Sequence, residues 1–260
     1  MYFLGIDIGS TSSDVVIMGD GNEIIARSVV QLGTGTDGPQ RAYEQALKEA
    51  VLTPEDISCT VATGYGRMNW KGADTEVSEL TCHALGVNYL IPSARTVIDI
   101  GGQDAKALRI GPKGELINFV MNDKCAAGTG RFLNVMAMIL NLRIDELGPL
   151  SLKSEQPSII SNTCTVFAES EVISKLSAHV PVEDIIAGIH KSVASRVSGM
   201  AMRVGIEDDV CMSGGVALNQ GVVKAMEKEL GRPVKVHGDC QLAGAIGAAI
   251  YAGRHNKRKG

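Results

Sequence analysis

The chain has 260 residues, of which 45% are hydrophobic and 21% are charged, and its formal net charge is −4. This length allows one large domain or two small ones, and the slight excess of acid argues against a nucleic-acid or membrane binder. The apolar start of the chain contains Asp7 and lacks a basic segment, so it indicates a first strand and not a signal peptide. No uncharged apolar stretch reaches the ~20 residues of a membrane helix, and we expect a cytoplasmic protein.

An internal repeat predicts two similar lobes. Residues 6–10 read Ile-Asp-Ile-Gly-Ser, and residues 98–102 read Ile-Asp-Ile-Gly-Gly. Each copy continues into a second strand, a Gly-rich hairpin turn and a third strand. The predicted strands span 2–8, 14–18 and 23–30 in the first copy, and 96–100, 105–110 and 115–121 in the second.

Helices follow both copies. Pro39 suits the first turn of a helix at 39–48, and residues 131–140 are rich in helix formers. The resulting prediction is a mixed α/β fold with two similar lobes, at residues 1–94 and 95–240. Further strand–helix alternation is predicted at 60–63, 77–90, 210–212, 222–230, 234–236 and 241–252.

The turn after the first strand of each copy has the composition of a phosphate-binding loop. Glycine lets backbone N–H groups approach a phosphate, and small hydroxyl side chains add donors. Asp7 and Asp99, at the strand ends, are candidates to hold Mg²⁺ through its waters, and Gln103 or Asp104 to orient an attacking water. Two hairpin turns with capping acids are the alternative, but the matched contexts favour a site. The candidate phosphate ligands are Gly9, Ser10, Thr11, Ser12, Gly101 and Gly102.

A third glycine motif follows the predicted strand at 210–212. Ser213, Gly214 and Gly215 lead from that strand into a helix, which allows a base or ribose to approach the backbone of Gly214, Gly215 and Asn219. Residues 33–38 match the dinucleotide pattern G-x-G-x-x-G, but they follow the third strand of a meander and not the first strand of a βαβ unit. No G-x-x-x-x-G-K-[ST] loop is present.

These three motifs resemble those of the actin, sugar-kinase and Hsp70 ATPase superfamily. Residues 5–11 are similar to its first phosphate motif, 99–104 to its second and 213–215 to its adenosine motif. The resemblance implies two duplicated RNase-H-like lobes that close on Mg-ATP in a nucleotide cleft. It also implies that the C-terminal helix, within residues 241–260, packs back on the first lobe.

Four of the six cysteines have ordinary settings. Cys59 and Cys211 fall in apolar strands and Cys82 in a helical run, which favours buried thiols, and Cys240 lies in a loop without a clear role. No Cys-x-x-Cys pair occurs, which argues against a zinc site within one chain.

Cys125 and Cys164 differ because each precedes a predicted helix. A helix N-terminus favours the thiolate, the form that binds metal. Ser, Asn or Thr at 161–163 is expected to cap the second of these helices, with Glu169 and Glu171 in its first turns. Two thiolates are half of what a four-iron cluster takes, and a two-fold dimer would double them. The spacing alone leaves both a shared cluster and two buried thiols open.

Longer motifs at 62–67, 122–133, 164–174 and 185–190 resemble the activators of 2-hydroxyacyl-CoA dehydratases, along essentially the whole chain. The resemblance implies that Cys125 and Cys164 bind one [4Fe-4S] cluster shared by a homodimer. It implies an ATP-hydrolysing, one-electron reductase that receives electrons from ferredoxin or flavodoxin and activates an iron–sulfur dehydratase or reductase.

Two other functions remain as alternatives. A small-molecule kinase of the same fold would use Asp123 or Glu169 as its base, although helix capping explains either acid. A nucleotide-sensing regulator would use the ATP site without redox chemistry. An iron–sulfur activator would be brown when purified anaerobically, whereas a kinase or sensor would be colourless.

Overall fold

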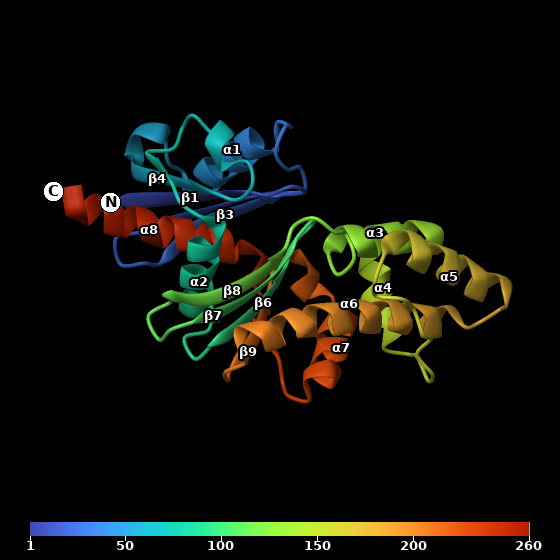
Figure 1. Cartoon of the computed structure of the whole chain (residues 1–260). Coiled ribbons are helices and arrows are strands. Elements are labelled where there is room, and N and C mark those ends of the chain that lie inside the picture. The colour runs from blue at the N-terminus through green and yellow to red at the C-terminus, as the bar shows by residue number, and fades with distance from the viewer. Residues whose placement is uncertain (260) are drawn as a thin grey trace. The chain divides into compact units, whose positions relative to one another are not determined.

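The computed structural model describes the backbone of residues 1–259 and the side chains of residues 1–256. The chain divides into two compact units and contains two five-stranded sheets (Figure 1). Unit 1 comprises Met1–Ala94, Ile110–Ile117 and the C-terminal segment from Asp239, and unit 2 comprises Arg95–Arg109 and Asn118–Gly238. Among the described residues, no helix combines the length and apolar character needed to cross a membrane.

The first sheet has the strand order β3-β2-β1-β4-β5. Strands β1, β2 and β3 form the predicted antiparallel meander, while β4 pairs in parallel with β1 and β5 in parallel with β4. The sequence prediction of the meander is confirmed to within one residue at nearly every strand end. The strands are β1 (Tyr2–Ile8), β2 (Ser13–Gly19), β3 (Ile24–Val30), β4 (Ile57–Thr63) and β5 (Thr75–Glu76).

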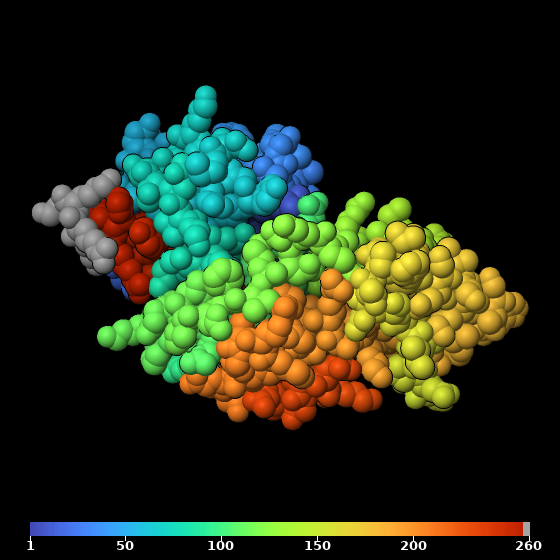
Figure 2. Space-filling model, viewed as in Figure 1, coloured from blue at the N-terminus to red at the C-terminus, as the bar shows by residue number. Residues whose placement is uncertain are grey.

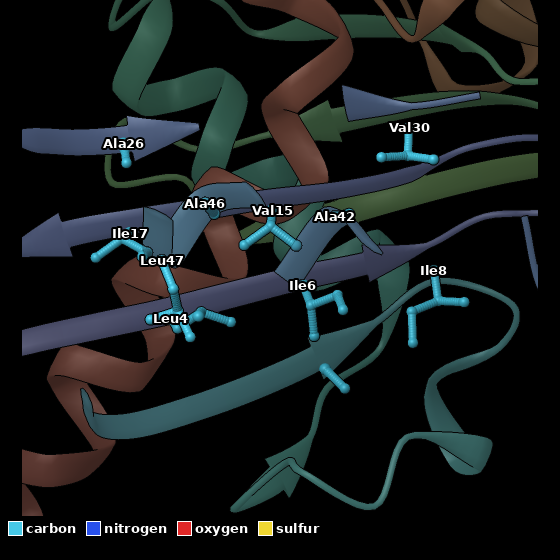
Figure 3. Close-up of a cluster of buried hydrophobic side chains, with 11 residues drawn as sticks. Leu4, Ile6, Ile8, Val15, Ile17, Ala26, Val30, Ala42, Ala46 and Leu47 are labelled. Carbon is cyan, nitrogen blue, oxygen red and sulfur yellow. The ribbon is translucent and has the colours of Figure 1, made fainter. Parts of the chain in front are cut away.

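Alternate residues of the central strands face different helices, as the two-residue period of a strand requires. Val15 and Ile17 belong to the cluster that packs on helix α1 (Gly38–Ala50). Val16 and Met18 pack instead with helix α8 (Ala243–Lys259). Figure 3 shows the first of these clusters, in which Leu4, Ile6, Ile8, Ala26 and Val30 of the sheet join Ala42, Ala46 and Leu47 of α1.

Glycines allow helices α2 (Glu79–Leu90) and α8 to pack at close range. A Cβ on Gly86 of α2 would lie 1.8 Å from the carbonyl oxygen of Ala243, and a Cβ on Gly247 of α8 would lie 1.8 Å from that of Cys82. Any side chain at either position would force the two backbones apart. The close packing holds α8 against the first sheet, where it contacts β1, β2 and β4.

The second sheet repeats the topology of the first. Its order is β10-β9-β6-β7-β8, with β6 antiparallel to β7, β9 parallel to β6 and β10 parallel to β9. The duplication predicted from two short motifs therefore extends to all five strands of each sheet. The strands are β6 (Thr96–Ile100), β7 (Ala105–Ile110), β8 (Leu116–Asn122), β9 (Val210–Ser213) and β10 (Lys235–Val236).

Unit 2 also contains five α-helices among its described residues. Helix α6 is the longest of them and packs on α4, α7 and α5, while α3 packs on α5. The sequence did not predict α6 as a helix. The helices are α3 (Gly130–Ile139), α4 (Leu147–Ser151), α5 (Thr165–Ser177), α6 (Val182–Val204) and α7 (Gln220–Leu230). Short 3-10 helices in the chain span Pro54–Asp56, Arg67–Asn69, Ile144–Glu146, Gly215–Leu218 and Cys240–Leu242.

Candidate functional site

The turn between β1 and β2 presents the first phosphate-loop motif. Asp7 near the end of β1 is paired in register with Asp14 of β2, and the Gly9 N–H donates to the Ser12 carbonyl at 2.9 Å. The Gly9 carbonyl accepts from the Thr34 N–H at 2.9 Å, which ties the turn to the loop after β3. Both carboxyl groups are buried, whereas the candidate phosphate ligands Gly9, Ser10, Thr11 and Ser12 are half-buried or exposed.

The two buried acids of this turn repel each other. Burial, and next the charge of Asp7, raise the pKa of Asp14 to about 8, against hydrogen bonds from Ser12 Oγ at 3.1 Å and Gln241 Nε2 at 3.5 Å. The Asp7 Oδ2 atom lies 3.6 Å from His83 Nε2, which balances the charge of that carboxylate only when the ring is protonated. A divalent cation would relieve the repulsion, because Mg²⁺ prefers carboxylate oxygens.

Two glycines allow the backbone to pack closely against the Asp7 carboxylate. A Cβ on Gly64 would lie 2.2 Å from Asp7 Oδ1, and a Cβ on Gly244 would lie 1.9 Å from Asp7 Oδ2. Gly64 also has a φ of +83°, which glycine adopts without strain. The oxygens of Asp7 therefore lie directly against the backbone of these two glycines, and the carboxyl groups of Asp7 and Asp14 supply the kind of ligand that Mg²⁺ prefers.

The turn between β6 and β7 occupies the equivalent place in the second sheet but has a different charge balance. Asp99 of β6 is paired in register with Lys106 of β7. The Lys106 Nζ atom is 3.1 Å from Asp99 Oδ2 and 2.8 Å from Asp104 Oδ2, and Lys106 is only 1% exposed. Ser213 Oγ donates to Asp99 Oδ1 at 2.8 Å. The buried acid of the second turn is thus neutralised within the protein.

The second turn is also tied to the start of α3. The Gly130 N–H donates to the Gly101 carbonyl at 2.9 Å, and the Arg131 N–H donates to the Gly102 carbonyl at 2.7 Å. Gln103, one of the two residues predicted to orient a water, is exposed at the tip of the turn. Asp104, the other, pairs with Lys106. The helix that follows Cys125 therefore begins at the phosphate-loop motif.

The third motif lies beside the second turn. Gly214 has a φ of +81°, and a Cβ there would lie 2.5 Å from the Ile100 carbonyl oxygen, so only glycine allows this approach. Gly215 begins a 3-10 helix, and Asn219 caps α7 by accepting from two N–H groups at 3.0 and 3.2 Å. Asn219 thus orients the start of α7 and does not lie in the Ser-Gly-Gly turn itself.

A buried histidine contacts that cap. His190 of α6 lies 3.0 Å through Nδ1 from Ser151 Oγ and 3.3 Å through Nε2 from Asn219 Nδ2. Burial lowers the pKa of His190 to about 3, so the ring stays neutral at physiological pH. The neutral ring acts as a hydrogen-bonding brace between α4, α6 and the residue before α7.

The six cysteines fall into two groups. Cys125 and Cys164 are half-buried, and the other four, Cys59, Cys82, Cys211 and Cys240, are buried. Burial raises the pKa of the Cys82 and Cys211 thiols to about 12, so both remain protonated. The prediction that Cys59, Cys82 and Cys211 are buried thiols is confirmed.

Both half-buried cysteines belong to segments that start helices of unit 2. Cys125 lies in the segment between β8 and α3, where the Asn122 side chain donates to its carbonyl at 2.8 Å. Cys164 is the N-cap residue of α5, and α5 packs on α3. Two half-buried thiols per chain fit half of the four-thiolate set of a [4Fe-4S] cluster.

The expected capping of α5 was wrong. No side chain makes a cap hydrogen bond there, and no acid lies in the first helical turn. Glu171 instead accepts from the Ser161 N–H at 2.6 Å, and the Asn162 and Thr163 carbonyls accept from Arg196 of α6. The segment before Cys164 is therefore held by other elements and not by its own helix.

Sequence reasoning missed four residues of these sites: Asp14, His83, Lys106 and Arg196. An alignment of the two copies could have revealed Asp14 and Lys106, because each lies seven positions after the strand-end acid. His83 and Arg196 come from helices and contact the sites only through the tertiary fold, so no local pattern marks them.

Comparison with known proteins gives a match along nearly the whole chain. Residues 4–252 match the BadF/BadG/BcrA/BcrD ATPase family. The 2-hydroxyisocaproyl-CoA dehydratase activator of Clostridioides difficile is 55% identical over 252 residues, which are 97% of this chain and 95% of the relative. The (R)-2-hydroxyglutaryl-CoA dehydratase activating ATPase of Acidaminococcus fermentans is 55% identical over 253 residues, 97% of each chain.

Solved structures give the same result for the fold. The activator of the 2-hydroxyisocaproyl-CoA dehydratase from Clostridium difficile, solved with bound ADPNP, has a TM-score of 0.96 at 54% identity, covering 100% of this chain and 97% of that one. A ROK family glucokinase from Streptomyces griseus, solved with glucose and AMPPNP, has a TM-score of 0.60 at 15% identity and covers 100% of both chains. The similarity to the glucokinase extends to the fold alone. These findings confirm the predicted fold class, two duplicated α/β lobes of the actin-like ATPase type.

Proposed function

The chain belongs to the BadF/BadG/BcrA/BcrD ATPase family, and we propose that it is an ATP-dependent activator of a 2-hydroxyacyl-CoA dehydratase or a related iron–sulfur enzyme. The observation that carries the proposal is the 55% identity, along 97% of the chain, to two proteins named as such activators. A subunit of benzoyl-CoA reductase from Thauera aromatica is 34% identical to this chain. This similarity extends the proposed acceptor enzymes to related reductases.

The nucleotide half of the function rests on the two hairpin turns. We assign Mg²⁺ binding to Asp7 and Asp14, because their two buried carboxyl groups are paired in register across the turn and Mg²⁺ prefers carboxylate oxygens. The backbone of Gly9 and the hydroxyls of Ser10, Thr11 and Ser12 supply hydrogen-bond donors to phosphate oxygens.

The second turn contributes the remaining nucleotide groups. Gly101 and Gly102 offer backbone to the phosphates, and Gln103 orients the attacking water. Asp99 and Asp104, both paired with Lys106, hold the shape of this turn. Gly214 and Gly215 allow the adenosine to approach, and Asn219 fixes the helix after them.

The redox half rests on Cys125 and Cys164, which would hold one [4Fe-4S] cluster together with the same two cysteines of a second copy. When bound, such a cluster supplies one-electron transfer at a potential that depends on its hydrogen bonds and solvent exposure. The two segments suit this task because both thiols are half-buried, whereas the other four cysteines are buried. Ferredoxin or flavodoxin would donate the electron, in keeping with the cytoplasmic location predicted from the sequence.

The surface beside Cys164 supports the homodimer. Val166 and Phe167, in the first turn of α5 and two and three residues after this cysteine, are 64% and 63% exposed. The atoms of α5, yellow to gold in Figure 2, lie at the surface of unit 2. Large apolar side chains exposed at the start of a helix are typical of a surface that another protein covers. A second copy seated there would bring its own cysteines to the same place.

ATP hydrolysis reaches the cysteines through α3 in this proposal. The first two residues of α3 donate backbone hydrogen bonds to Gly101 and Gly102 of the second turn, and Cys125 lies five positions before the helix. A change of phosphate contacts at the turn therefore acts on the segment that carries the thiol. The electron passed onward makes the acceptor enzyme active.

The small-molecule kinase is not favoured. Its support is a 15% identical glucokinase, whose similarity concerns the fold only, whereas the activators are 55% identical. Neither candidate base has a setting that requires it: Asp123 is exposed in the loop before Cys125, and Glu169 lies in the second turn of α5.

Activation of an acceptor tests the proposal. Inactive 2-hydroxyisocaproyl-CoA and (R)-2-hydroxyglutaryl-CoA dehydratases are each mixed anaerobically with the protein, reduced flavodoxin and Mg-ATP, and formation of the enoyl-CoA is followed. We expect MgATP-dependent dehydration with at least one acceptor, abolished in Cys125→Ser and Cys164→Ser and retained in the matched control Cys59→Ala. ATP hydrolysis without activation of either acceptor, together with phosphorylation of a sugar or acid, would support the kinase instead.

A further inference from the structure

The segment before Cys164 is bound to helix α6 by one arginine. The Nη1 atom of Arg196 donates to the carbonyl oxygen of Asn162 at 2.9 Å and to that of Thr163 at 3.4 Å. Thr163 is the residue immediately before Cys164, and Cys164 caps α5 with its backbone in the extended region. The guanidinium thus fixes the last two peptide groups before the thiol.

The same arginine touches the segment that carries Cys125. Gly128 follows that cysteine by three residues, and a Cβ built on it would lie 3.0 Å from Arg196 Cδ and 3.5 Å from Arg196 Cγ. The φ of Gly128 is +85°, a conformation in which a larger residue would be strained. The glycine therefore lets the backbone of the Cys125 segment rest on the aliphatic stem of Arg196.

One side chain consequently contacts both cysteine segments, with its stem against one and its head against the other. Two serines of α6 add support to the Cys164 side: Ser192 Oγ donates to the Ser161 carbonyl at 2.9 Å, and the Asn162 amide lies 3.4 Å from Ser195 Oγ. Arginine suits the double contact, because it combines a long apolar stem with several donors in a rigid plane.

We propose that Arg196 is a positioning residue that fixes the Cys125 and Cys164 segments relative to each other and so presets the two metal-binding thiols of each chain. This inference rests on the proposed function, because it assigns the two thiols to a cluster. The positive charge of the guanidinium also favours the net negative charge of a four-thiolate cluster, so its removal lowers the midpoint potential.

The test measures how fast iron leaves the anaerobically purified dimer to a ferrous chelator in excess. The variants are Arg196→Ala, Arg196→Lys and the matched control Arg203→Ala, an exposed arginine of the same helix. We expect iron release about tenfold faster in Arg196→Ala and an intermediate rate in Arg196→Lys, which keeps the stem and the charge but loses the planar fork. Arg203→Ala is expected to match the wild type. Release from Arg196→Ala within twofold of the wild type would overturn the inference.

A second readout needs no iron. Hydrogen exchange of the backbone amides at 161–165 is compared between the wild-type and Arg196→Ala proteins, with circular dichroism as the check on folding. Exchange about tenfold faster in Arg196→Ala is expected, since the anchor of this segment is lost. Unchanged exchange would overturn the positioning role. Wild-type protein that binds no iron would instead overturn the proposed function, while the exchange result would still decide whether Arg196 holds the segment.

Discussion

Asp7 on β1 and Asp99 on β6 occupy the same place in two copies of one hairpin, and each is paired across the strands with the residue seven positions later. In the first copy that residue is Asp14, and in the second it is Lys106. Both strand-end acids are buried, at 7% and 1% exposure, so each requires compensation. The second copy supplies a buried ammonium group, whereas the first places a further carboxylate beside the acid.

In the proposed nucleotide site, the difference teaches how a duplicated fold could divide the work of binding Mg-ATP between two copies of one hairpin. A fixed positive charge makes the second turn complete without a ligand, so it serves as a rigid frame. The pair of carboxyl groups in the first turn shares a proton on Asp14, and in the proposed nucleotide site a metal ion would take its place. The residue opposite the strand-end acid is an aspartate in the first hairpin and a lysine in the second. This one difference is enough to give two similar hairpins different tasks.

Among the variants that test this comparison, substitution of Lys106 should have the largest effect on the free energy of unfolding. Lys106→Met would leave Asp99 and Asp104 without their buried counter-charge, and we expect the free energy of unfolding to fall by about 3–5 kcal/mol. Urea unfolding at pH 7 measures the change. Lys113→Met, an exposed lysine in the next turn, is the control and should alter stability little. A loss as small as that of the control would mean that the second turn is not held by its ion pairs.

Asp14→Asn should instead raise the free energy of unfolding. The pKa of Asp14 is raised from 3.8 to about 8, so between these values the folded protein holds a proton that the unfolded chain releases. Wild-type stability therefore falls as the pH rises through this window, by up to ~1.4 kcal/mol per pH unit. The Asp14→Asn variant lacks this dependence of stability on pH.

Over the three units from pH 5 to pH 8 this dependence on pH amounts to at most ~4 kcal/mol, and we expect the free energy of unfolding of Asp14→Asn, without nucleotide or Mg²⁺, to rise relative to the wild type by an amount of that order. Urea unfolding at the two pH values gives the difference, with the exposed Asp20→Asn as the control. If the free energies of unfolding of the wild type and Asp14→Asn changed in parallel with pH, the first turn would contain no acid with a raised pKa.

The smallest effects concern the serines that donate a hydrogen bond to one acid in each turn, Ser213 to Asp99 and Ser12 to Asp14. Ser213→Ala removes a 2.8 Å hydrogen bond to the fully paired Asp99, and we expect a loss of about 1.5 kcal/mol. Ser12→Ala removes a 3.1 Å hydrogen bond to Asp14 and should cost less, about 0.5–1 kcal/mol, because a pKa of about 8 leaves that carboxyl mostly protonated at pH 7. Thermal unfolding of both variants at pH 7 tests the order. A larger loss in Ser12→Ala would reverse the assignment of charge to the two turns.

Much of the fold could be predicted because the repeat is local. The strands at both hairpins, α1 and α3 have strong turn signals or helix formers within a few residues. Helix α6 was missed because it is rich in Val, Ile, Ser and Gly, which are weak helix formers, and its stability comes from burial on several sides. Lys106 and Arg196 were missed for a related reason: a lysine or arginine in the sequence suggests an exposed charge, and only cross-strand register or tertiary packing reveals the partner.

The central claim is that two cysteines from each of two chains hold one cluster. Iron and acid-labile sulfide per dimer, measured on anaerobically purified protein whose mass is determined in the same preparation, test it most directly. We predict four irons and four sulfides per dimer in the wild type, and their loss in both Cys125→Ser and Cys164→Ser. A monomer, or a dimer that hydrolyses ATP but holds no iron, would contradict the account.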